Sequence, residues 1–469
     1  METQECDIGV VGLGVMGRNL LLNMLDHGYS TAGLDTDTAK ARSFIDDARN
    51  TRASVTTKPQ TFVAMLREPR AIILLVPAGP PVDAVIRELL PLLSPGDLLI
   101  DAGNSHFTDT DRRSAALADK GIHFFGMGVS GGESGARHGP SMMPGGPKDA
   151  YQRVRPMLEA IAAKVGAEPC VAYLGSGSAG HYVKMVHNGI EYGLMQLIAE
   201  TYDLMRRGLG FDNKMLHEVF DSWNKSELHS FLIEITAAIF LKQDDRTGKP
   251  LIDLVRDVAR QKGTGKWTSQ NAMDLQTSIP TIDAAVAARD LSGYNDEREA
   301  ASRVYIRQPS PFQGDAPALL TQLRRSLYAA MIITYAQGLA LLRRASEIYN
   351  YDIDLEAVAR IWRGGCIIRA AVLDDIRAAF HSRPEFPNLL LDPRLAETIA
   401  TRQADLRAVV KLAVELAIPS PALMASLAYF DGYRSDRLPA NLIQAQRDFF
   451  GAHTYERTDE DGVFHTKWS

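Results

Sequence analysis

The sequence has few cysteines and no apolar run long enough to cross a membrane. Three of its 469 residues are cysteine, Cys6, Cys170 and Cys366, and none of them forms a C-x-x-C pair. We therefore expect neither a disulfide framework nor a zinc site, and a reducing compartment is the default. No apolar run approaches the roughly 18 residues that a membrane helix needs, and the N-terminus lacks the pattern of a signal peptide. The protein is expected to be cytoplasmic, without a membrane partner.

The sequence also lacks an excess of basic residues and the common hydrolase motifs. Its 57 acidic and 51 basic residues give a formal charge of −6, which argues against a general nucleic-acid binder. No HExxH, no G-x-S-x-G and no cluster of Asp and His ligands occurs, so neither metal nor serine-nucleophile chemistry is supported. Hydrophobic residues make up 45% of the chain, enough for two or three domains with real cores.

The first third of the chain alternates short apolar runs with amphipathic stretches. The runs expected to be buried strands are Ile8–Val11, Thr31–Leu34, Ala71–Val76, Leu98–Asp101, His123–Phe125 and 170–173. The stretches expected to be helices are 15–27, 38–49, 80–93, 108–120 and 149–165. This alternation predicts βαβ units and a doubly wound, mostly parallel sheet.

The character of the sequence changes near residue 179. Residues 1–178 are predicted to be one α/β domain, and residues 179–435 an all-helical domain, because Ala, Leu, Met, Glu and Arg recur there at helical spacing. The stretch Met195–Leu209 resembles Gln337–Ser346, with a tryptophan after each, which hints at an internal duplication. Residues 436–469 are polar and irregular and are predicted to be a tail.

A glycine-rich turn follows the first predicted strand. Gly12, Gly14 and Gly17 form G-x-G-x-x-G, with Val15 and Met16 opening the next helix. The three glycines permit a tight turn, close approach of a pyrophosphate and close helix–strand packing, and the helix N-terminus offers free N–H groups to phosphate. The turn predicts a dinucleotide site rather than a merely structural turn, because a strand, a helix and a later acidic residue all accompany it.

That acidic residue is Asp35, at the end of the second predicted strand, followed by Thr36 and Asp37. An aspartate at this position can accept hydrogen bonds from the adenosine ribose hydroxyls and repels a 2′-phosphate. A second negative charge at Asp37 adds to this repulsion. We therefore expect NAD to be preferred over NADP.

The densest group of chemically active residues lies in one predicted helix. Lys184, His187, Asn188 and Glu191 follow at i, i+3, i+4 and i+7 and share a face. A desolvated lysine can take up and return a proton, and a carboxylic acid two turns away can protonate a different atom. The alternative is a solvated Glu–Lys face, although His, Asn and the nearby glycines are unusual on a surface helix.

Two further glycine-rich segments could contact a ligand. Gly126–Gly135 is predicted to be a loop after a strand, where Ser130 and the N–H groups of Gly131 and Gly132 could bind a carboxylate or hydroxyls. Asn104 is similarly placed after the preceding strand.

The segment Gln261–Trp267 is not a P-loop, because Arg260 and Trp267 stand where glycine and Ser/Thr are required. A loop that contacts substrate phosphate and an ordinary solvated basic loop both remain open.

Eight strings of residues closely resemble the decarboxylating 6-phosphogluconate dehydrogenase family. They are GLGVMGRNL, ILLVPAG, LIDAGNS, GVSGGESGARHGPSMMPGG, GHYVKMVHNGIEYG, RQKGTGKW, WRGGCIIR and LPANLIQAQRDFFGAHTYE. They extend over essentially the whole chain. The resemblance implies a Rossmann domain, a large all-α domain with internal duplication, and a C-terminal tail. It implies oxidation and decarboxylation of 6-phosphogluconate to ribulose 5-phosphate in the pentose phosphate pathway, with NAD or NADP and no metal.

The resemblance also implies a role for each matching residue. Lys184 would be the general base at the substrate 3-hydroxyl, and Glu191 would protonate C1 of the enediol. The sugar acid would be held by Asn104, Ser130, Gly131, Gly132, His187 and Asn188, and its phosphate by Tyr192, Lys262, Thr264 and Arg289. Val76, Pro77, Ala78 and Asn104 would join the glycine turn at the cofactor. Arg447 and His453 would enter the active site of the neighbouring subunit in a homodimer.

The chain departs from the family at the adenosine end of the cofactor site. NADP-using members commonly carry Asn-Arg-Thr in place of Asp35-Thr36-Asp37, Ala in place of Gly14 and Lys in place of Pro77. Each difference removes room or positive charge at a 2′-phosphate, or adds negative charge. The alternatives to this family are a shorter β-hydroxyacid dehydrogenase, such as the 3-hydroxyisobutyrate type, and a catalytically silent NAD(H)-binding dimer.

Overall fold

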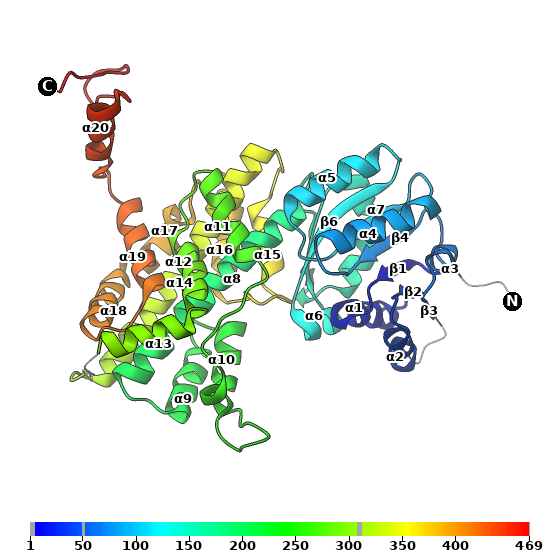
Figure 1. Ribbon diagram of the computed structural model, residues 1–469, viewed down its shortest axis with the longest axis horizontal. Helices are drawn as coiled ribbons and strands as arrows, with labels where there is room; N and C mark the ends of the chain where they lie inside the picture. The colour runs from blue at the N-terminus through cyan, green and yellow to red at the C-terminus, as the bar shows by residue number, and fades with distance from the viewer. Residues whose placement is uncertain (1–4, 49–51, 307–311, 469) are drawn as a thin grey trace.

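The computed structural model describes residues 5–48, 52–306 and 312–468. It has an α/β part and a helical part side by side, with a C-terminal helix standing apart (Figure 1). The α/β part is built on a seven-stranded sheet in the order β3-β2-β1-β4-β5-β6-β7. The strands are β1 (Ile8–Val11), β2 (Thr31–Leu34), β3 (Ala53–Thr56), β4 (Ala71–Leu74), β5 (Leu98–Asp101), β6 (His123–Ser130) and β7 (Ser141–Gly145). Pairing is parallel from β3 to β6 and antiparallel between β6 and β7.

Helices cover both faces of this sheet. They are α1 (Val15–Asp26), α2 (Thr38–Ala48), α3 (Pro59–Ala64), α4 (Pro80–Leu89), α5 (Phe107–Ala118), α6 (Gly132–His138) and α7 (Lys148–Ile161). Along β4, Ile73 packs into the core with α1 and α7, whereas Ile72 and Leu74 pack into the core with α3 and α4. Strands buried on both faces carry continuous apolar runs, which is why the sequence revealed them. The predicted doubly wound fold is confirmed.

Two strands were missed, one predicted strand does not form, and the predicted strand Ala71–Val76 ends at Leu74. β3 and β7 were missed, because β3 is a short, half-buried edge and β7 contains Gly145 and Pro144. The predicted strand 170–173 forms no strand, although Val171 makes one parallel bridge to Met142 of β7. Pro144 has no N–H to continue that ladder. A two-stranded ribbon, β8 (Lys164–Val165) with β9 (Glu168–Pro169), takes up the end of the predicted helix 149–165.

The glycine-rich segment Gly126–Gly135 is not a loop as predicted. Residues 126–130 continue strand β6, and α6 begins at Gly132. The other predicted helices agree with the structure to within a few residues; the last residue of the predicted helix 38–49 lies outside the described residues.

The second part of the chain is helical. Its helices are α8 (Ala179–Asp203), α9 (Asn213–Trp223), α10 (Phe231–Leu241), α11 (Thr264–Asp274), α12 (Pro280–Ser292), α13 (Asn295–Val304), α14 (Ala316–Tyr349), α15 (Leu355–Trp362), α16 (Val372–Ser382), α17 (Pro393–Ala400), α18 (Gln403–Glu415), α19 (Pro421–Tyr433) and α20 (Ala440–Gly451). Short helical turns occupy Leu90–Leu92, Leu204–Gly208, Leu251–Leu254 and Leu389–Leu391. No helix within the described ranges is both long and apolar enough to span a bilayer.

The longest helices, α8 and α14, lie against each other at the centre of the helical part. Gly193 of α8 faces Thr334 of α14, and Gly338 of α14 faces Ile190 of α8. Because glycine has no side chain, the two backbones can lie close together at these positions. Each helix is followed by one that ends at a tryptophan, α9 at Trp223 and α15 at Trp362. This parallel supports the predicted duplication, which stays a prediction.

The C-terminal segment is not irregular as predicted, because it contains the helix α20. Within it, the buried carboxylate of Asp448 accepts hydrogen bonds from the backbone of Thr454 and Thr466 and from Trp468 Nε1. Tyr455 and Phe464 form a backbone bridge. These contacts hold the segment together, while Figure 1 shows α20 projecting beyond α19, away from the α/β part.

Candidate active site

The glycine turn joins β1 to α1 at the carboxyl edge of the sheet. Gly12 has φ +97°, and a Cβ there would lie 2.5 Å from the carbonyl oxygen of Leu75. A Cβ at Gly17 would collide with the carbonyl of Gly12, whereas nothing lies within 4 Å of a Cβ at Gly14. Two glycines are therefore required by packing, and the third leaves an open cradle at the N-terminus of α1, bordered by Val15 and Met16. The cradle fits a dinucleotide pyrophosphate.

Asp35 lies beside this turn. Its Oδ2 accepts a hydrogen bond from the N–H of Leu13 at 2.8 Å, and its Oδ1 accepts one from the N–H of Asp37 at 2.9 Å. The carboxylate is thus anchored next to the cradle at the end of β2, while Thr36 and Asp37 are exposed. This is the position at which an acidic residue meets the adenosine ribose in such folds.

Two loops at the carboxyl ends of β4 and β5 complete this edge of the sheet. The first contains Val76, Pro77 and Ala78, and the second presents Asn104 as an exposed side chain. A Cβ at Gly103 would lie 3.4 Å from the carbonyl oxygen of Val76, so the two loops are in contact. The order of the strands places them on the side of β1 opposite to Asp35.

Helix α8 packs directly against strand β6, because glycines line the contact. A Cβ at Gly128 would collide with the side chain of Lys184, and a Cβ at Gly126 with the ring of His181. On its other side, Gly189 faces Thr268 of α11. The alternative of a solvated Glu–Lys face is therefore wrong, since α8 is surrounded by protein and Lys184 is only 6% exposed.

Polar groups of α8 meet around the ring of His187. Its Nδ1 lies 3.5 Å from Lys184 Nζ and 3.1 Å from Asn188 Oδ1, and its Nε2 lies 3.4 Å from Ser130 Oγ. Glu191 Oε2 is 3.9 Å from the same Nδ1. The predicted catalytic residues are thus brought together, with Ser130 supplied by the end of β6. Gly131 and Gly132 follow directly at the start of α6.

Burial shifts the proton equilibria of this group. Desolvation lowers the pKa of Lys184, against the opposing effect of the Glu191 charge. Desolvation raises the pKa of Glu191, partly offset by Lys184 and Arg289. Desolvation and the Lys184 charge hold the pKa of His187 well below its ordinary range, so the ring is neutral. Both Lys184 and Glu191 are shifted towards their uncharged forms, which suits a lysine base and a carboxylic acid.

A second polar group lies around Tyr192, the residue that follows Glu191 on α8. The guanidinium carbon of Arg289, on α12, is 3.4 Å from the centre of the Tyr192 ring. A Cβ at Gly265 would touch the same ring, so Thr264 at the start of α11 is a neighbour. Lys262 is exposed in the preceding segment, and Gly263, with φ +103°, caps the helix. The segment is therefore a turn into a helix N-terminus, which with two cations can bind a phosphate.

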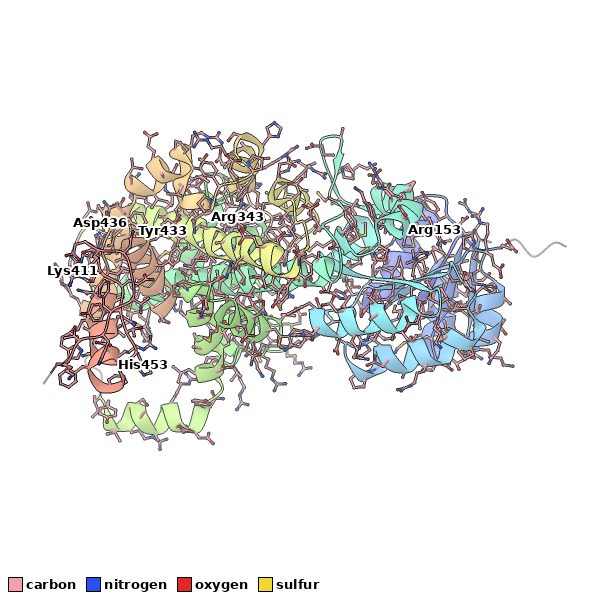
Figure 2. The ribbon with its side chains drawn as sticks, turned by 90° about the horizontal axis from the view of Figure 1, so that it is seen from above. Arg153, Arg343, Lys411, Tyr433, Asp436 and His453 are labelled. Atoms are coloured by element: carbon pink, nitrogen blue, oxygen red, sulfur yellow. The ribbon has the colours of Figure 1, made fainter. Side chains whose placement is uncertain are left out.

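Arg447 and His453 are not brought to this site within one chain. Arg447 lies on α20 and contacts Gln444 of its own helix. Figure 2 shows His453 at the opposite end of the molecule from Arg153 of the α/β part.

Two features of the site escaped sequence reasoning. Cys366 is a buried free thiol near Lys184, and burial raises the pKa of this thiol to about 12. Arg113 of α5 is buried beneath the loops after β4 and β5. Asp101, in the string LIDAGNS, could have predicted a buried cation nearby, because a buried carboxylate needs a partner. No group of three or more His, Cys, Asp or Glu suited to a metal ion occurs in the described part of the chain.

The open glycine cradle on a doubly wound sheet, with a desolvated lysine in an adjoining helix, defines a nicotinamide-dinucleotide-dependent dehydrogenase. Comparison with known proteins is more specific. Residues 7–175 match the NAD binding domain of 6-phosphogluconate dehydrogenase, and residues 180–468 match the C-terminal domain of the same enzyme. The chain therefore belongs to the decarboxylating 6-phosphogluconate dehydrogenase family, and the resemblance found in the sequence is confirmed.

Full-length relatives support this assignment. The decarboxylating 6-phosphogluconate dehydrogenase of Synechococcus elongatus is 54% identical over 465 residues, covering 98% of each chain. The NADP(+)-dependent, decarboxylating enzyme of Bacillus subtilis is 51% identical and covers 98% of each chain. The solved 6-phosphogluconate dehydrogenase of Plasmodium falciparum, studied with NADP+ and with 6-phosphogluconate, has a TM-score of 0.96 and 44% identity over 99% of this chain and 100% of its own.

Proposed function

We propose that this chain oxidises 6-phosphogluconate at C3 and decarboxylates the product to ribulose 5-phosphate. The observation that carries the proposal is the buried group of Lys184, His187, Asn188 and Glu191 beside the dinucleotide cradle. Its two ionisable ends are shifted towards neutral forms, as two separate proton transfers require. The Plasmodium falciparum relative was studied with this substrate, which supports the choice among hydroxy acids.

Lys184 performs the first proton transfers. Its neutral Nζ takes the proton of the substrate 3-hydroxyl, and a bound nicotinamide dinucleotide supplies the acceptor for the hydride from C3. The ammonium then returns its proton to the 3-keto oxygen while CO2 leaves, so that the electrons of the broken C–C bond are accommodated in an enediol. His187 contacts the amine, and Asn188 contacts the ring of His187. Both side chains would also contact the sugar hydroxyls.

Glu191 completes the reaction by donating a proton to C1 of the enediol. Its raised pKa keeps a larger fraction of the carboxyl protonated than an ordinary glutamate would have. Ser130, Gly131, Gly132 and Asn104 bind the sugar acid near the sheet. Arg289, Tyr192, Lys262 and Thr264 bind its phosphate about two turns along α8, which orients C1 to C3 between Lys184 and Glu191.

The cofactor lies over the glycine cradle, with Gly12, Gly14 and Gly17 at the pyrophosphate. We propose that NAD is preferred. The Bacillus subtilis and Plasmodium falciparum proteins are named with NADP+, so the names of the relatives indicate NADP and do not support NAD. The preference rests on this chain's own Asp35, whose anchored carboxylate repels a 2′-phosphate, and on Asp37 beside it.

The proposal is tested by initial-rate kinetics on the purified protein with 6-phosphogluconate and either NAD or NADP. Turnover with NAD in excess of NADP supports both parts. Turnover that favours NADP keeps the reaction and overturns the cofactor preference. Absence of turnover with both cofactors would overturn the proposed reaction and favour a catalytically silent dinucleotide-binding protein.

A segment exchange tests the cofactor preference directly. Replacing Asp35-Thr36-Asp37 by Asn-Arg-Thr removes two negative charges that repel the 2′-phosphate and adds an arginine that can bind it. The ratio of kcat/KM with NADP to that with NAD should therefore rise by about 10²-fold. The matched control is Asp46→Asn, an exposed charge on helix α2, which follows the exchanged segment. An unchanged ratio would place the discrimination elsewhere.

We further propose a homodimer in which Arg447 and His453 reach the substrate of the neighbouring subunit. Four apolar side chains of α20 are 60–72% exposed: Leu442, Ile443, Phe449 and Phe450. A group of exposed apolar side chains of this kind marks a surface that a partner covers. A second copy of the chain is the partner that also explains why Arg447 and His453 lie far from the Lys184 of their own chain.

A further inference from the structure

One buried arginine joins the two loops that follow β4 and β5. Arg113, on α5, is 2% exposed, and all five of its N–H groups have acceptors. Nε and Nη2 donate to the two carboxylate oxygens of Asp83 at 2.9 and 3.1 Å, and Nη2 also donates to the carbonyl of Gly79 at 2.9 Å. Nη1 donates to Asp101 Oδ2 at 3.3 Å and to Ser105 Oγ at 3.4 Å.

These acceptors belong to both loops. Gly79 ends the loop that contains Val76, Pro77 and Ala78, and Asp83 lies in the first turn of the following helix α4. Asp101 is the last residue of β5, and Ser105 lies one residue beyond Asn104. A single guanidinium therefore determines the spacing of the two loops.

The second loop is also clamped on either side of Asn104. Asp101 Oδ1 accepts the N–H of Gly103 at 3.0 Å, and Asp101 Oδ2 accepts the hydroxyl of Ser105 at 2.6 Å. Because both neighbours bind the same carboxylate, the Asn104 side chain is held pointing outward at the loop tip, where it is exposed. Arg113 neutralises that carboxylate, which would be costly to bury alone.

The position of the Arg113 hydrogen bonds along the sheet indicates which half of the cofactor lies above them. The adenosine end lies at β2 with Asp35, and the dinucleotide crosses the edge of β1 towards β4 and β5. The loops joined by Arg113 therefore lie under the nicotinamide half and not under the ADP half.

We propose that Arg113, with Asp83 and Asp101, is a positioning residue that holds these two loops in register under the nicotinamide ribose and ring. Arg113 touches neither cofactor nor substrate; it acts through Asn104 and the Val76–Ala78 loop. The inference rests on the proposed function, because those loops are the proposed contacts of the cofactor.

The test compares binding of the whole dinucleotide with binding of its ADP-ribose part. In Arg113→Lys, which keeps the charge but loses the fork of donors, the Kd for NADH measured by fluorescence titration should rise about tenfold or more and kcat should fall, because a loop displaced by about 1 Å is costly to catalysis. The Kd for ADP-ribose should stay within about twofold, because the β1 and β2 contacts are unchanged. If the kinetics favour NADP, NADPH and 2′-phospho-ADP-ribose replace these probes.

Two further variants keep the test decisive. Asp83→Asn removes the bidentate carboxylate from a partly exposed position and should reproduce the effect if Arg113→Lys does not fold. Arg112→Ala is the matched control, because this exposed neighbour contacts the same Asp83 from the solvent side and should change neither Kd.

The outcomes separate the two proposals. Equal loss of NADH and ADP-ribose binding, or a lowered Tm with both Kd values unchanged, would assign Arg113 a merely structural role and overturn the inference. Wild-type protein that binds neither probe would instead overturn the dinucleotide part of the proposed function.

Discussion

Lys184 owes its chemistry to its surroundings more than to its identity. The same residue type at Lys266 is exposed on α11, whereas Lys184 is packed against Gly128 and the His187 ring. Desolvation lowers its pKa, so more of the amine is in the form that accepts a proton at neutral pH. Burial at this one position therefore makes a lysine, which is a cation when exposed, suitable as a base.

Replacing this amine tests its role. In Lys184→Met a side chain of similar length fills the same space, so kcat should fall by about 10²–10⁴-fold, the usual contribution of a general base. Binding of the dinucleotide and the Tm should be retained or improved, because a buried polar amine has been replaced by an apolar side chain. Rates and thermal unfolding are measured beside Lys266→Met, which should match wild type. Comparable activity in both variants would remove Lys184 from the mechanism.

At the scale of elements, α8 connects the site to the rest of the helical part. Its first half carries the catalytic group, and its second half carries Glu200, which is 2% exposed. The Glu200 oxygens accept the N–H groups of Ala422 and Leu423 at 2.8 and 2.9 Å, at the start of α19. The helix that leads to the C-terminal segment is thereby fixed to the catalytic helix.

The burial of Glu200 makes stability depend on pH. Burial raises the pKa of Glu200 from 4.5 to about 7, although hydrogen bonds from Ala422, Leu423 and Gln196 lower it in part. A carboxyl whose folded pKa is raised contributes stability that is full below about pH 4.5 and is lost as the pH rises towards 7. The gap between the two values corresponds to about 3 kcal/mol.

The variant Glu200→Gln should lose this dependence. Urea unfolding at pH 5 and pH 8 should show wild type losing stability relative to the variant as the pH rises, by up to about 3 kcal/mol. Glu218→Gln, on the exposed face of α9, is the control and should keep the wild-type profile. A wild-type profile in Glu200→Gln would show that the carboxylate is charged throughout this range.

At the scale of the whole molecule, one chain carries both a catalytic group and a C-terminal segment that lies away from it. Figures 1 and 2 place α20 and His453 at the far end of the helical part, beyond α19. The proposed exchange between subunits makes each active site a product of two chains. It predicts that defects in the two parts complement each other.

Mixed dimers provide the measurement. Lys184→Met and Arg447→Ala should each be nearly inactive alone, but refolding them together in equal amounts should restore about a quarter of wild-type activity. Random pairing makes about half of the dimers mixed, and each mixed dimer has one complete site. Each variant refolded alone is the control. Absence of recovery, with mixed dimers demonstrated by differential tagging, would contradict the exchange.

Local patterns in the sequence were sufficient for much of this protein. Continuous apolar runs predicted β1, β2 and β5 with their observed bounds, because strands buried on both faces need little context. The turn at Gly12, and the one-face spacing of Lys184 and Glu191, follow from backbone geometry within a few residues. The eight strings that resemble the family extended the prediction to the reaction, because they contain the residues of whole sites.

What only the tertiary structure decided depends on residues far apart in the chain. Gly126 and Gly128 were predicted to form a loop, but they are strand positions emptied for α8, which a sequence does not state. β7 was hidden by its proline and glycine and exists because β6 pairs with it. Arg113 has no motif of its own, because its five acceptors come from separate segments that meet only when the sheet has formed. Periodicity is a property of neighbours along the chain, whereas burial, pairing and the pKa shifts they cause are properties of neighbours in space.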